Sequence, residues 1–437
     1  MKRHERKRLT FALNCAENSV MHLRYDLVVV GGGINGAAVA RDASGRGLST
    51  LLVEQEDLAS HTSSASTKLI HGGLRYLEQG HFRMVRKALA ERERLMSTAP
   101  HLIRPLEFVL PLDGRSRPRW LLRLGLLIYD ALGGKHSLPA SAGVRLDQGN
   151  YAGQLNPACT RGFAYYDCWG DDSRLVIANA QDAAEKGATV LTRTRCVRVH
   201  RRPLDWHVEL ERSAGPRRTV NARAIVNATG SGTAEFLQNR AEVEPMGAMR
   251  LVKGSHIVTR RLYPGDHAYV LQNSDKRIVF VIPYEDDFSL IGTTDVEWGA
   301  EPTGVSIDAT EIDYLCRAVN RWLRQQITPA DVLWSFAGIR SLFDDHSTSA
   351  SEISREYVLS LDEANGRPPI LSVYGGKITT HRALAENALD RLVHHFEGVG
   401  PPWTREAPLP GGDLGDRGLA GLVGDLTDVA PFLDRRM

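Results

Sequence analysis

Short apolar runs near the start of the chain alternate with a pattern of small residues. The run Tyr25–Val30 is rich in valine and long enough for a buried strand, and Ala37–Arg46 predicts a helix with small residues on the face that would meet a sheet. Ser49–Val53 predicts a second buried strand, which ends at Glu54. This strand–helix–strand order predicts a βαβ unit, whose crossover implies a parallel sheet covered by helices.

The later patterns add helices and a second kind of sheet. Residues from about 250 to 295 alternate between apolar and polar positions and are divided by turns at Pro264–Gly265 and Glu285–Asp287, which predicts antiparallel strands. A long amphipathic helix is predicted from Leu74 to about Ser97. Further helices are predicted over Asp172–Lys186, Ile312–Gln326 and from Gly375 to about His395.

Composition narrows the class of protein. The chain has 437 residues, 42% hydrophobic and 24% charged, which suits two or three packed lobes and excludes disordered, collagen-like and coiled-coil chains. The net charge of +2 gives no basic field for nucleic acid. Residues 1–24 alone carry a net charge of +4, so we expect either a disordered basic extension or a true start at Met21.

The cysteine pattern and the hydropathy point to a compartment. None of the five cysteines has C-x-x-C spacing, which argues against a disulfide framework and a zinc site and fits a reducing, cytoplasmic location. The sequence contains no run of 18 apolar residues, so it predicts no membrane span. No metal is expected, because no His, Asp and Glu cluster shows ligand spacing.

A glycine-rich motif lies between the first predicted strand and its helix. Gly31 permits the tight turn, Gly33 lets the backbone approach a pyrophosphate, and Gly36 lets the helix pack closely on the sheet. The helix N-terminus then favours the anion. Glu54 can accept hydrogen bonds from the adenosine ribose hydroxyls. The motif therefore predicts a dinucleotide-binding domain.

Two observations favour FAD over NAD. The chain has one G-x-G-x-x-G fingerprint, whereas a flavoprotein reductase that also binds NAD normally shows two. The predicted strand that begins at Ala224 ends in Ala-Thr-Gly at Gly230, as does a late strand that returns to the cofactor in FAD proteins.

Six motifs occur together at compatible spacing: Val30–Gly36, Ser63–Leu77, Lys253–Val258, Lys276–Pro283, Ile291–Asp295 and Gly375–Thr380. On these motifs the sequence resembles the FAD-dependent (aerobic, quinone-linked) sn-glycerol-3-phosphate dehydrogenase family from Tyr25 to about Pro410. Two positions depart from the family: Ser341 follows Arg340 where proline is usual, and Gly230-Ser-Gly-Thr replaces Gly-Pro-Trp.

The resemblance implies an α/β fold, in which an FAD-binding, Rossmann-like (doubly wound) domain is joined to an antiparallel-sheet substrate domain, as in the D-amino-acid-oxidase and glycerol-3-phosphate-dehydrogenase group. The implied division is a discontinuous FAD-binding domain at about 25–75, 160–232 and 345–395, a substrate or cap domain at about 76–159 and 233–344, and a truncated remnant of a C-terminal helical domain at 396–437.

The implied reaction is oxidation of sn-glycerol 3-phosphate to dihydroxyacetone phosphate, with hydride transfer from C2 to flavin N5 and electrons passed to a quinone. A phosphate dianion needs fixed cations. The family positions that match are Arg75, Arg340 and Lys377, with Tyr76 as a hydroxyl donor, and Arg340 and Lys377 are also expected to serve catalysis.

A histidine suits the role of base, because it titrates near neutral pH. His256 is the first candidate, and His71 and His381 remain alternatives. The polar loop Ser63–Thr67 is expected to line the flavin pyrophosphate and ring. The residues expected to bind FAD are Gly31, Gly33, Asn35, Gly36, Glu54, Ser64, Ser66, Thr67, Gly230 and Gly376.

Some interpretations stay open. The stretch Trp120–Tyr129, preceded by Arg115, Arg117 and Arg119, suits an interfacial helix for peripheral contact with the cytoplasmic face of the inner membrane, or else a core helix. The resemblance also permits a homodimer. A same-fold amine or amino-acid oxidase and a non-catalytic flavin-binding paralogue are the alternative functions.

Overall fold

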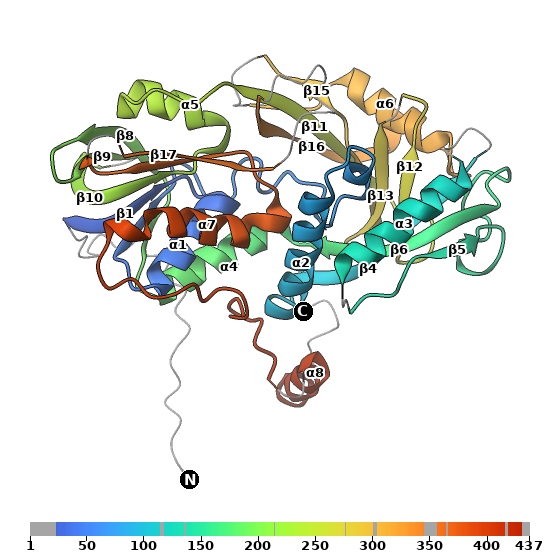
Figure 1. Ribbon diagram of the computed structural model, residues 1–437. Coiled ribbons are helices and arrows are strands. Elements are labelled where there is room, and N and C mark those ends of the chain that lie inside the picture. Colours follow the sequence, from blue (N-terminus) through green and yellow to red (C-terminus); the bar gives the residue numbers. More distant parts are fainter. Residues whose placement is uncertain are drawn as a thin grey trace, which may run out of the picture.

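The computed structural model describes residues 23–113, 118–134, 137–213, 215–275, 277–299, 304–344, 356–363, 366–415 and 418–430. Two β-sheets lie beside each other, the first at the left and the second at the right of Figure 1. Almost all of the predicted basic extension at 1–24 lies outside the described residues. The described part of the chain is therefore organised around two sheets.

The first sheet contains the predicted βαβ unit. Its order is β17-β18-β10-β1-β2-β7, and β1 runs parallel to both β10 and β2, as the crossover predicts. Strands β9 and β8 extend it antiparallel from β10, and β17 pairs antiparallel with β18. The strands are β1 (Arg24–Val30), β2 (Thr50–Val53), β7 (Thr189–Leu191), β8 (Thr194–Arg201), β9 (Trp206–Arg212), β10 (Arg218–Asn227), β17 (Val358–Asp362) and β18 (Ile370–Tyr374).

Three helices lie below this sheet in Figure 1 and bury its lower face: α1 (Ile34–Gly45), α4 (Asp172–Glu185) and α7 (His381–Leu392). Helix α1 is rich in alanine, and Ala37, Ala40 and Ala43 are fully buried. Small side chains let its backbone approach the sheet and both neighbouring helices, so the predicted close packing is confirmed. Above the sheet lie η3 (Gly230–Gly232), α5 (Thr233–Phe236) and the π-turn η4 (Leu237–Ala241).

The second sheet has the order β15-β11-β14-β13-β12-β4-β6-β3, with β16 on β11 and β5 on β6. All of its pairings are antiparallel except that of β12 with β4, which confirms the antiparallel prediction. Its strands are β3 (Leu69–Ile70), β4 (Ile103–Leu112), β5 (Ala142–Arg145), β6 (Arg161–Gly170), β11 (Met249–Arg260), β12 (Ala268–Gln272), β13 (Ile278–Tyr284), β14 (Phe288–Gly292), β15 (Val296–Glu297) and β16 (Val332–Phe343).

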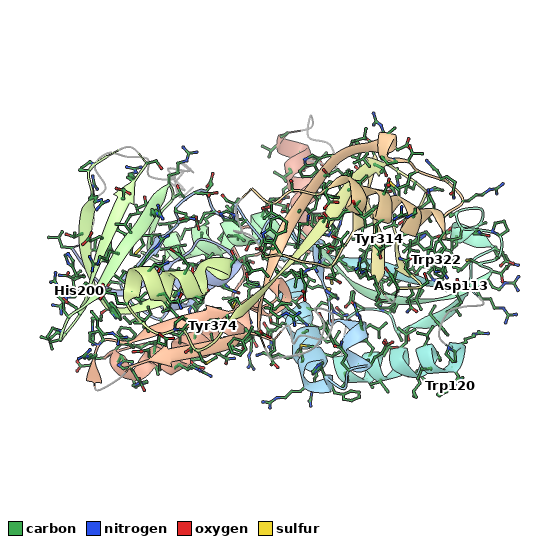
Figure 2. The ribbon with its side chains drawn as sticks, turned by 90° about the horizontal axis from the view of Figure 1, so that it is seen from above. Asp113, Trp120, His200, Tyr314, Trp322 and Tyr374 are labelled. Carbon is green, nitrogen blue, oxygen red and sulfur yellow. The ribbon has the colours of Figure 1, made fainter. Side chains whose placement is uncertain are left out.

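Helix α6 (Ala309–Asn320) packs on this sheet, and Trp322 just after it lies fully buried in a core with strands β12, β13 and β14 (Figure 2). Helix α3 (Arg119–Gly133) covers β4 and β6 from another side. The implied division assigned 160–232 to the FAD-binding domain. Strand β6 instead lies in the second sheet, because its ten residues pair with β4 along their full length.

The single helix predicted from Leu74 to Ser97 is wrong. The chain forms a short turn, η1 (Leu74–Leu77), and then helix α2 (Phe82–Thr98). Gly80 lies between them with φ of 76°, a left-handed conformation that glycine adopts without strain and that ends a helix. Of the residues of η1, Tyr76 lines a large cleft of the molecule.

Helix α7 is followed directly by a short turn, η8 (Val393–His395), and the chain then runs along the layer of helices. Arg41 donates to the carbonyls of Ala407 and Pro408, and the buried Leu409 pairs through its N–H with Thr98. Helix α8 (Gly418–Val429) follows and lies apart from both sheets in Figure 1. The remaining short turns are η2 (Gly149–Tyr151), η5 (Pro329–Asp331) and η7 (Ile378–Thr380).

Candidate active site

One large cleft, with a volume of about 1250 Å³, runs between the two sheets and is lined by the carboxyl ends of β1, β2, β10 and β18. Crevices at these strand ends are where open α/β sheets bind nucleotides. The predicted site residues that line it are Gly31, Gly33, Asn35, Glu54, Ser66, Thr67, Tyr76, Gly230, His256, Arg340, Gly376 and Lys377. Three predicted residues, Gly36, Ser64 and Arg75, are not among the lining residues.

The turn after β1 needs its glycines for close packing. Gly31 has φ of 109°, and a Cβ there would lie 2.4 Å from the carbonyl oxygen of Ala228. A Cβ at Gly36 would lie 1.9 Å from the carbonyl oxygen of Gly31, so this residue shapes the turn from inside the helix rather than from the cleft. A Cβ at Gly33 would meet Ser63 Oγ at 3.0 Å and otherwise fill open space in the cleft.

The N-terminus of α1 opens on this cleft. Gly33 is its N-cap and offers no side-chain acceptor, and Ile34 N donates to Ser63 Oγ at 3.0 Å. Unpaired N–H groups at such an end attract an anion. Ser63 is thus the serine of the predicted polar loop that contacts the helix start, whereas Ser64 Oγ donates to the carbonyl of His61 within the loop.

Glu54 holds the glycine turn from the next strand. Its Oε2 accepts from Gly32 N at 2.6 Å and its Oε1 from Glu56 N at 2.9 Å. The carboxylate is buried yet lines the cleft, so each oxygen keeps a lone pair for a further donor such as a ribose hydroxyl.

Asn35 connects the glycine turn to a segment 340 residues away. Its Nδ2 donates to the carbonyl of Gly375 at 3.1 Å, while its Oδ1 is buried without a partner. Gly375 and Gly376 have φ of 69° and 106°, conformations that suit glycine, and follow β18 directly. The cleft therefore has a buried acceptor without a donor at the point where the two nucleotide-binding segments meet.

His256, on β11, is fully buried in the wall of the cleft. Its Nε2 lies 2.9 Å from Thr67 Oγ1, its ring stacks on Phe336 at 4.8 Å, and its Nδ1 has no partner. Burial, and then the charges of Arg340 and Lys68, lower the pKa of His256 to about 3. The imidazole is therefore neutral at ordinary pH.

Arg340, on β16, lines the same cleft as His256, and its charge acts on that histidine. Its guanidinium pairs with the Asp295 carboxylate, and its Nη2 donates to Thr293 Oγ1 at 2.8 Å. Gly254 on the neighbouring strand makes room, because a Cβ there would lie 2.3 Å from Arg340 Nη2. The side chain is 20% exposed, so an incoming anion can reach it.

A buried carboxylate supports the loop that carries the partners of Arg340. Glu311 accepts from Ser255 Oγ at 2.9 Å and from Thr294 Oγ1 at 2.7 Å, and it pairs with Lys253 Nζ at 2.8 Å. Glu311 also closes a capping box with Asp308 at the start of α6. Helix α6 thereby fixes the Thr293–Asp295 loop at the edge of the cleft.

Lys377 and Tyr76 meet at the end of β18. Lys377 Nζ lies 3.9 Å from the centre of the Tyr76 ring and 3.4 Å from Met84 Sδ. Arg75, the neighbour of Tyr76 in η1, is half-buried and stays outside the lining. Of the predicted clamp, the structure therefore brings Arg340, Lys377 and Tyr76 to the same cleft.

Two residues that sequence reasoning missed hold the polar loop in place. Asp172, at the start of α4, is fully buried and binds Lys68 Nζ at 2.5 Å and Ser66 Oγ at 2.7 Å. Since Lys68 and Asp172 are 104 residues apart, no local pattern pairs them. Of the alternative bases, His71 lines the cleft, whereas His381 is buried outside its lining with Nδ1 2.7 Å from the carbonyl of Ile378.

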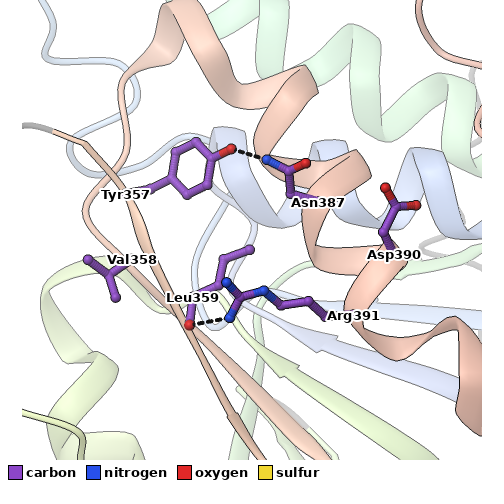
Figure 3. A pocket seen from close by; sticks show the side chains of 6 residues that line it. All are labelled: Tyr357, Val358, Leu359, Asn387, Asp390 and Arg391. Atoms are coloured by element: carbon purple, nitrogen blue, oxygen red, sulfur yellow. Dashed lines mark hydrogen bonds between the residues drawn. The ribbon is translucent and has the colours of Figure 1, made fainter. Parts of the chain in front are cut away.

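A smaller hollow of about 450 Å³ lies between β17 and α7 (Figure 3). Tyr357 accepts a hydrogen bond from Asn387 there, and Arg391 donates to the carbonyl of Leu359 at 2.6 Å. None of its lining residues is shared with the large cleft. None of the predicted site residues lines this hollow.

The residues of the large cleft fit an FAD. The Gly33 position is open to the cleft, the α1 N-terminus and the buried acceptor of Asn35 face the same turn, and the volume accommodates an elongated nucleotide. Residues 26–382 match the model of a family described as FAD dependent oxidoreductase.

Curated relatives extend the comparison. A glycerol-3-phosphate dehydrogenase of Pseudomonas aeruginosa is 52% identical, over 94% of this chain and 80% of that protein. A D-erythritol 1-phosphate dehydrogenase of Brucella abortus is 49% identical, over 94% of this chain and 82% of that protein. Among solved structures, a glycerol-3-phosphate dehydrogenase from Bacillus halodurans complexed with FAD has a TM-score of 0.71 and 26% identity, and the match covers 94% of this chain and 72% of that one.

Proposed function

Because this chain belongs to the FAD-dependent glycerol-3-phosphate dehydrogenase family, we propose that it oxidises the C2 hydroxyl of sn-glycerol 3-phosphate to give dihydroxyacetone phosphate. It is an oxidoreductase with FAD as its cofactor. The observation that carries the substrate proposal is the presence of two cationic side chains, Arg340 and Lys377, in the same cleft as a buried neutral histidine.

The two cations bind the phosphate in this proposal. Arg340 offers a planar fork that suits two phosphate oxygens, and Lys377 adds a point charge. Tyr76, 3.9 Å from the Lys377 ammonium, orients that charge and can donate its hydroxyl. A phosphate held between them leaves the rest of the polyol to extend toward the other groups of the cleft.

His256 acts as the base. Its Nε2 faces the Thr67 hydroxyl, which lines the cleft, and we assign the proton of the substrate hydroxyl to Nε2. Before the substrate binds, the Thr67 hydroxyl contacts this Nε2 atom and orients the imidazole. FAD held at Gly31, Gly33 and Glu54 would supply the two-electron redox chemistry that removes a hydride from the substrate, and a quinone is the acceptor that we propose for the electrons.

The test is the visible spectrum of the purified protein before and after anaerobic addition of glycerol 3-phosphate. The yellow flavin absorbance should bleach with glycerol 3-phosphate and persist with glycine or a secondary amine. Bleaching by an amino acid alone would assign the protein to the oxidases that act on C–N bonds. A flavin spectrum that no substrate changes would favour a non-catalytic flavin-binding protein.

A second substrate deserves a direct comparison, because one relative at 49% identity is named for D-erythritol 1-phosphate. The same phosphate clamp would hold either compound, so the groups around the polyol chain decide between them. The ratio of the two kcat/KM values, measured with an artificial dye, decides which polyol phosphate is the substrate.

We also propose that α3 contacts a membrane surface, where a quinone is reached. Trp120 at the outer edge of Figure 2 is 68% exposed, and three leucines of the same helix are exposed beside it, namely Leu121, Leu124 and Leu127. Of the three arginines that precede Trp120 in the sequence, Arg119 is the first residue of α3 and is exposed. Arg115 and Arg117 lie outside the described residues. In the described part of the chain, no helix is both long enough and apolar enough to cross a bilayer.

Vesicle sedimentation tests this contact. Trp120→Ser with Leu124→Ser should weaken binding to anionic vesicles, because both changes remove apolar area from the face. Leu204→Ser is the matched control, since Leu204 is 83% exposed on the β8–β9 turn of the other sheet. Equal binding by all three proteins would contradict the proposed surface.

A further inference from the structure

Three side chains with metal-ligating atoms meet at a place that the redox site does not use. Glu363 directly follows β17, and His394 and His395 form the end of η8. The Glu363 Oε2 atom lies 3.2 Å from His394 Nε2 and 2.9 Å from His395 Nε2. One ligand atom from each residue lies within 4.8 Å of the other two. None of the three residues lines the large cleft.

These separations are close to those within a metal coordination shell. Zinc binds imidazole nitrogen and carboxylate oxygen at about 2.0–2.2 Å, so two neighbouring ligands of a tetrahedral ion lie roughly 3.3 Å apart. The two nitrogen–oxygen separations need only small adjustments to reach that value. Without an ion, each imidazole must donate its Nε2–H to the same carboxylate oxygen, Glu363 Oε2. When both Nε2 atoms are deprotonated, their lone pairs and one lone pair of Glu363 Oε2 converge on one point.

The backbone on both sides of the cluster is held. Arg223 Nη2 donates to the carbonyl of His395 at 2.8 Å, and its guanidinium lies 5.2 Å from the centre of the buried Phe396 ring. On the other side, Asp362 is paired in the sheet with Ile370, so Glu363 leaves a fixed strand end. A ligand set on fixed backbone loses little conformational entropy when it binds an ion.

We propose that Glu363, His394 and His395 form a binding site for a divalent transition-metal ion, with Zn²⁺ as the ion best suited to two imidazoles and one carboxylate. Water completes the coordination, because the Glu363 and His394 side chains are 46% and 57% exposed. The ion would clamp the edge strand β17 to the end of the α7–η8 segment, and its role is structural. Local sequence patterns do not reveal this site, since 31 residues separate Glu363 from His394.

Calorimetric titration of the chelator-treated, FAD-loaded protein with ZnCl₂ tests the proposal. One equivalent should bind, and binding should weaken in acid, because an imidazole must be neutral to ligate. His394→Gln and Glu363→Gln should each lower the affinity more than about tenfold, since even outer-shell partners of a metal are worth about 10–100-fold. Co²⁺ in place of Zn²⁺ should give visible absorption bands that the variants lose.

A single histidine–carboxylate pair elsewhere in the chain supplies the control. His61 Nε2 lies 3.4 Å from Glu56 Oε2, and both side chains are about half exposed, so His61→Gln removes one imidazole but no three-ligand set. Its zinc affinity should equal that of the unchanged protein. The proposal is wrong if zinc does not bind with one-to-one stoichiometry, or if binding persists in the His394→Gln, His395→Gln double variant. The flavin spectrum, unchanged in the Glu363, His394 and His395 variants, reports that their fold is intact.

Discussion

Replacement of Arg340 by alanine is the sharpest test of the proposed phosphate clamp. The pair of Arg340 with Asp295 is largely shielded from water, since the two side chains are 20% and 15% exposed. A hydrogen bond to a charged group contributes about 1.5–3 kcal/mol, and truncation of one partner of a desolvated charge pair costs about 2–5 kcal/mol. We therefore expect Arg340→Ala to lose about 2–4 kcal/mol of transition-state binding, which lowers kcat/KM for glycerol 3-phosphate by roughly 30- to 1000-fold.

Asp295 makes the prediction more specific. In Arg340→Ala its carboxylate faces the cleft edge without this cation and repels a phosphate dianion. The double variant with Asp295→Asn removes that repulsion, so it should recover part of the lost kcat/KM. Arg340→Lys keeps the charge but not the planar fork, and its activity should fall between those of the unchanged protein and Arg340→Ala.

The assay is steady-state reduction of an artificial dye at a series of pH values, with the flavin spectrum recorded for each protein. Arg317→Ala is the control, because the Arg317 side chain is 70% exposed and pairs with Asp313 on the same helix, α6. Loss of the Arg340 charge also removes one cause of the low pKa of His256, so the acid limb of the kcat/KM profile should move to higher pH. A kcat/KM within a factor of two of the unchanged protein, with a normal flavin spectrum, would refute the clamp.

Three further predictions follow from the same contacts. Gly33→Val places a branched side chain in the open part of the cleft, so the protein should purify without yellow colour; full flavin occupancy would contradict the assignment of the turn. Glu311→Gln keeps the size of the side chain but removes the negative charge that pairs with Lys253, so kcat/KM should fall while the FAD content stays unchanged. Loss of FAD in this variant would refute a role confined to the loop that holds Arg340. Burial lowers the pKa values of His267 and His381 to about 4, so the unfolded chain binds more protons than the folded protein between pH 4 and about 6.5. The Tm should therefore rise with pH across that window. A constant Tm would contradict the presence of neutral buried histidines.

The parts of the site that depend on local sequence were predictable. The turn after β1 requires glycine at Gly31, whose φ is 109°, and at Gly36, whose Cβ would lie 1.9 Å from the carbonyl oxygen of Gly31, and a fingerprint records that requirement. Antiparallel strands between 250 and 295 were likewise visible as alternation. Short-range steric demands leave a short-range pattern.

The contacts that set charge in the cleft are long-range and left no such pattern. Lys68 meets Asp172 across 104 residues, and Asn35 meets Gly375 across 340. Which side chains of η1 face the cleft likewise depends on packing against distant elements: Tyr76 lines the cleft and Arg75 does not, and substrate binding by Arg75 stays a prediction. The positions of these side chains depend on how elements far apart in the sequence pack against each other.

The charges around His256 suggest how a weak base becomes useful. With a pKa of about 3, the imidazole alone accepts a proton poorly from an alcohol. Burial is the largest cause of that low pKa, and the positive charges of Arg340 and Lys68 lower it further. A phosphate dianion bound at Arg340 offsets the first of these charges, which raises the pKa of His256 and strengthens it as a base. In the proposed reaction, substrate binding thus prepares the proton acceptor, and a polyol that lacks phosphate should react slowly even at saturating concentration. Equal kcat values for glycerol and glycerol 3-phosphate would contradict this coupling.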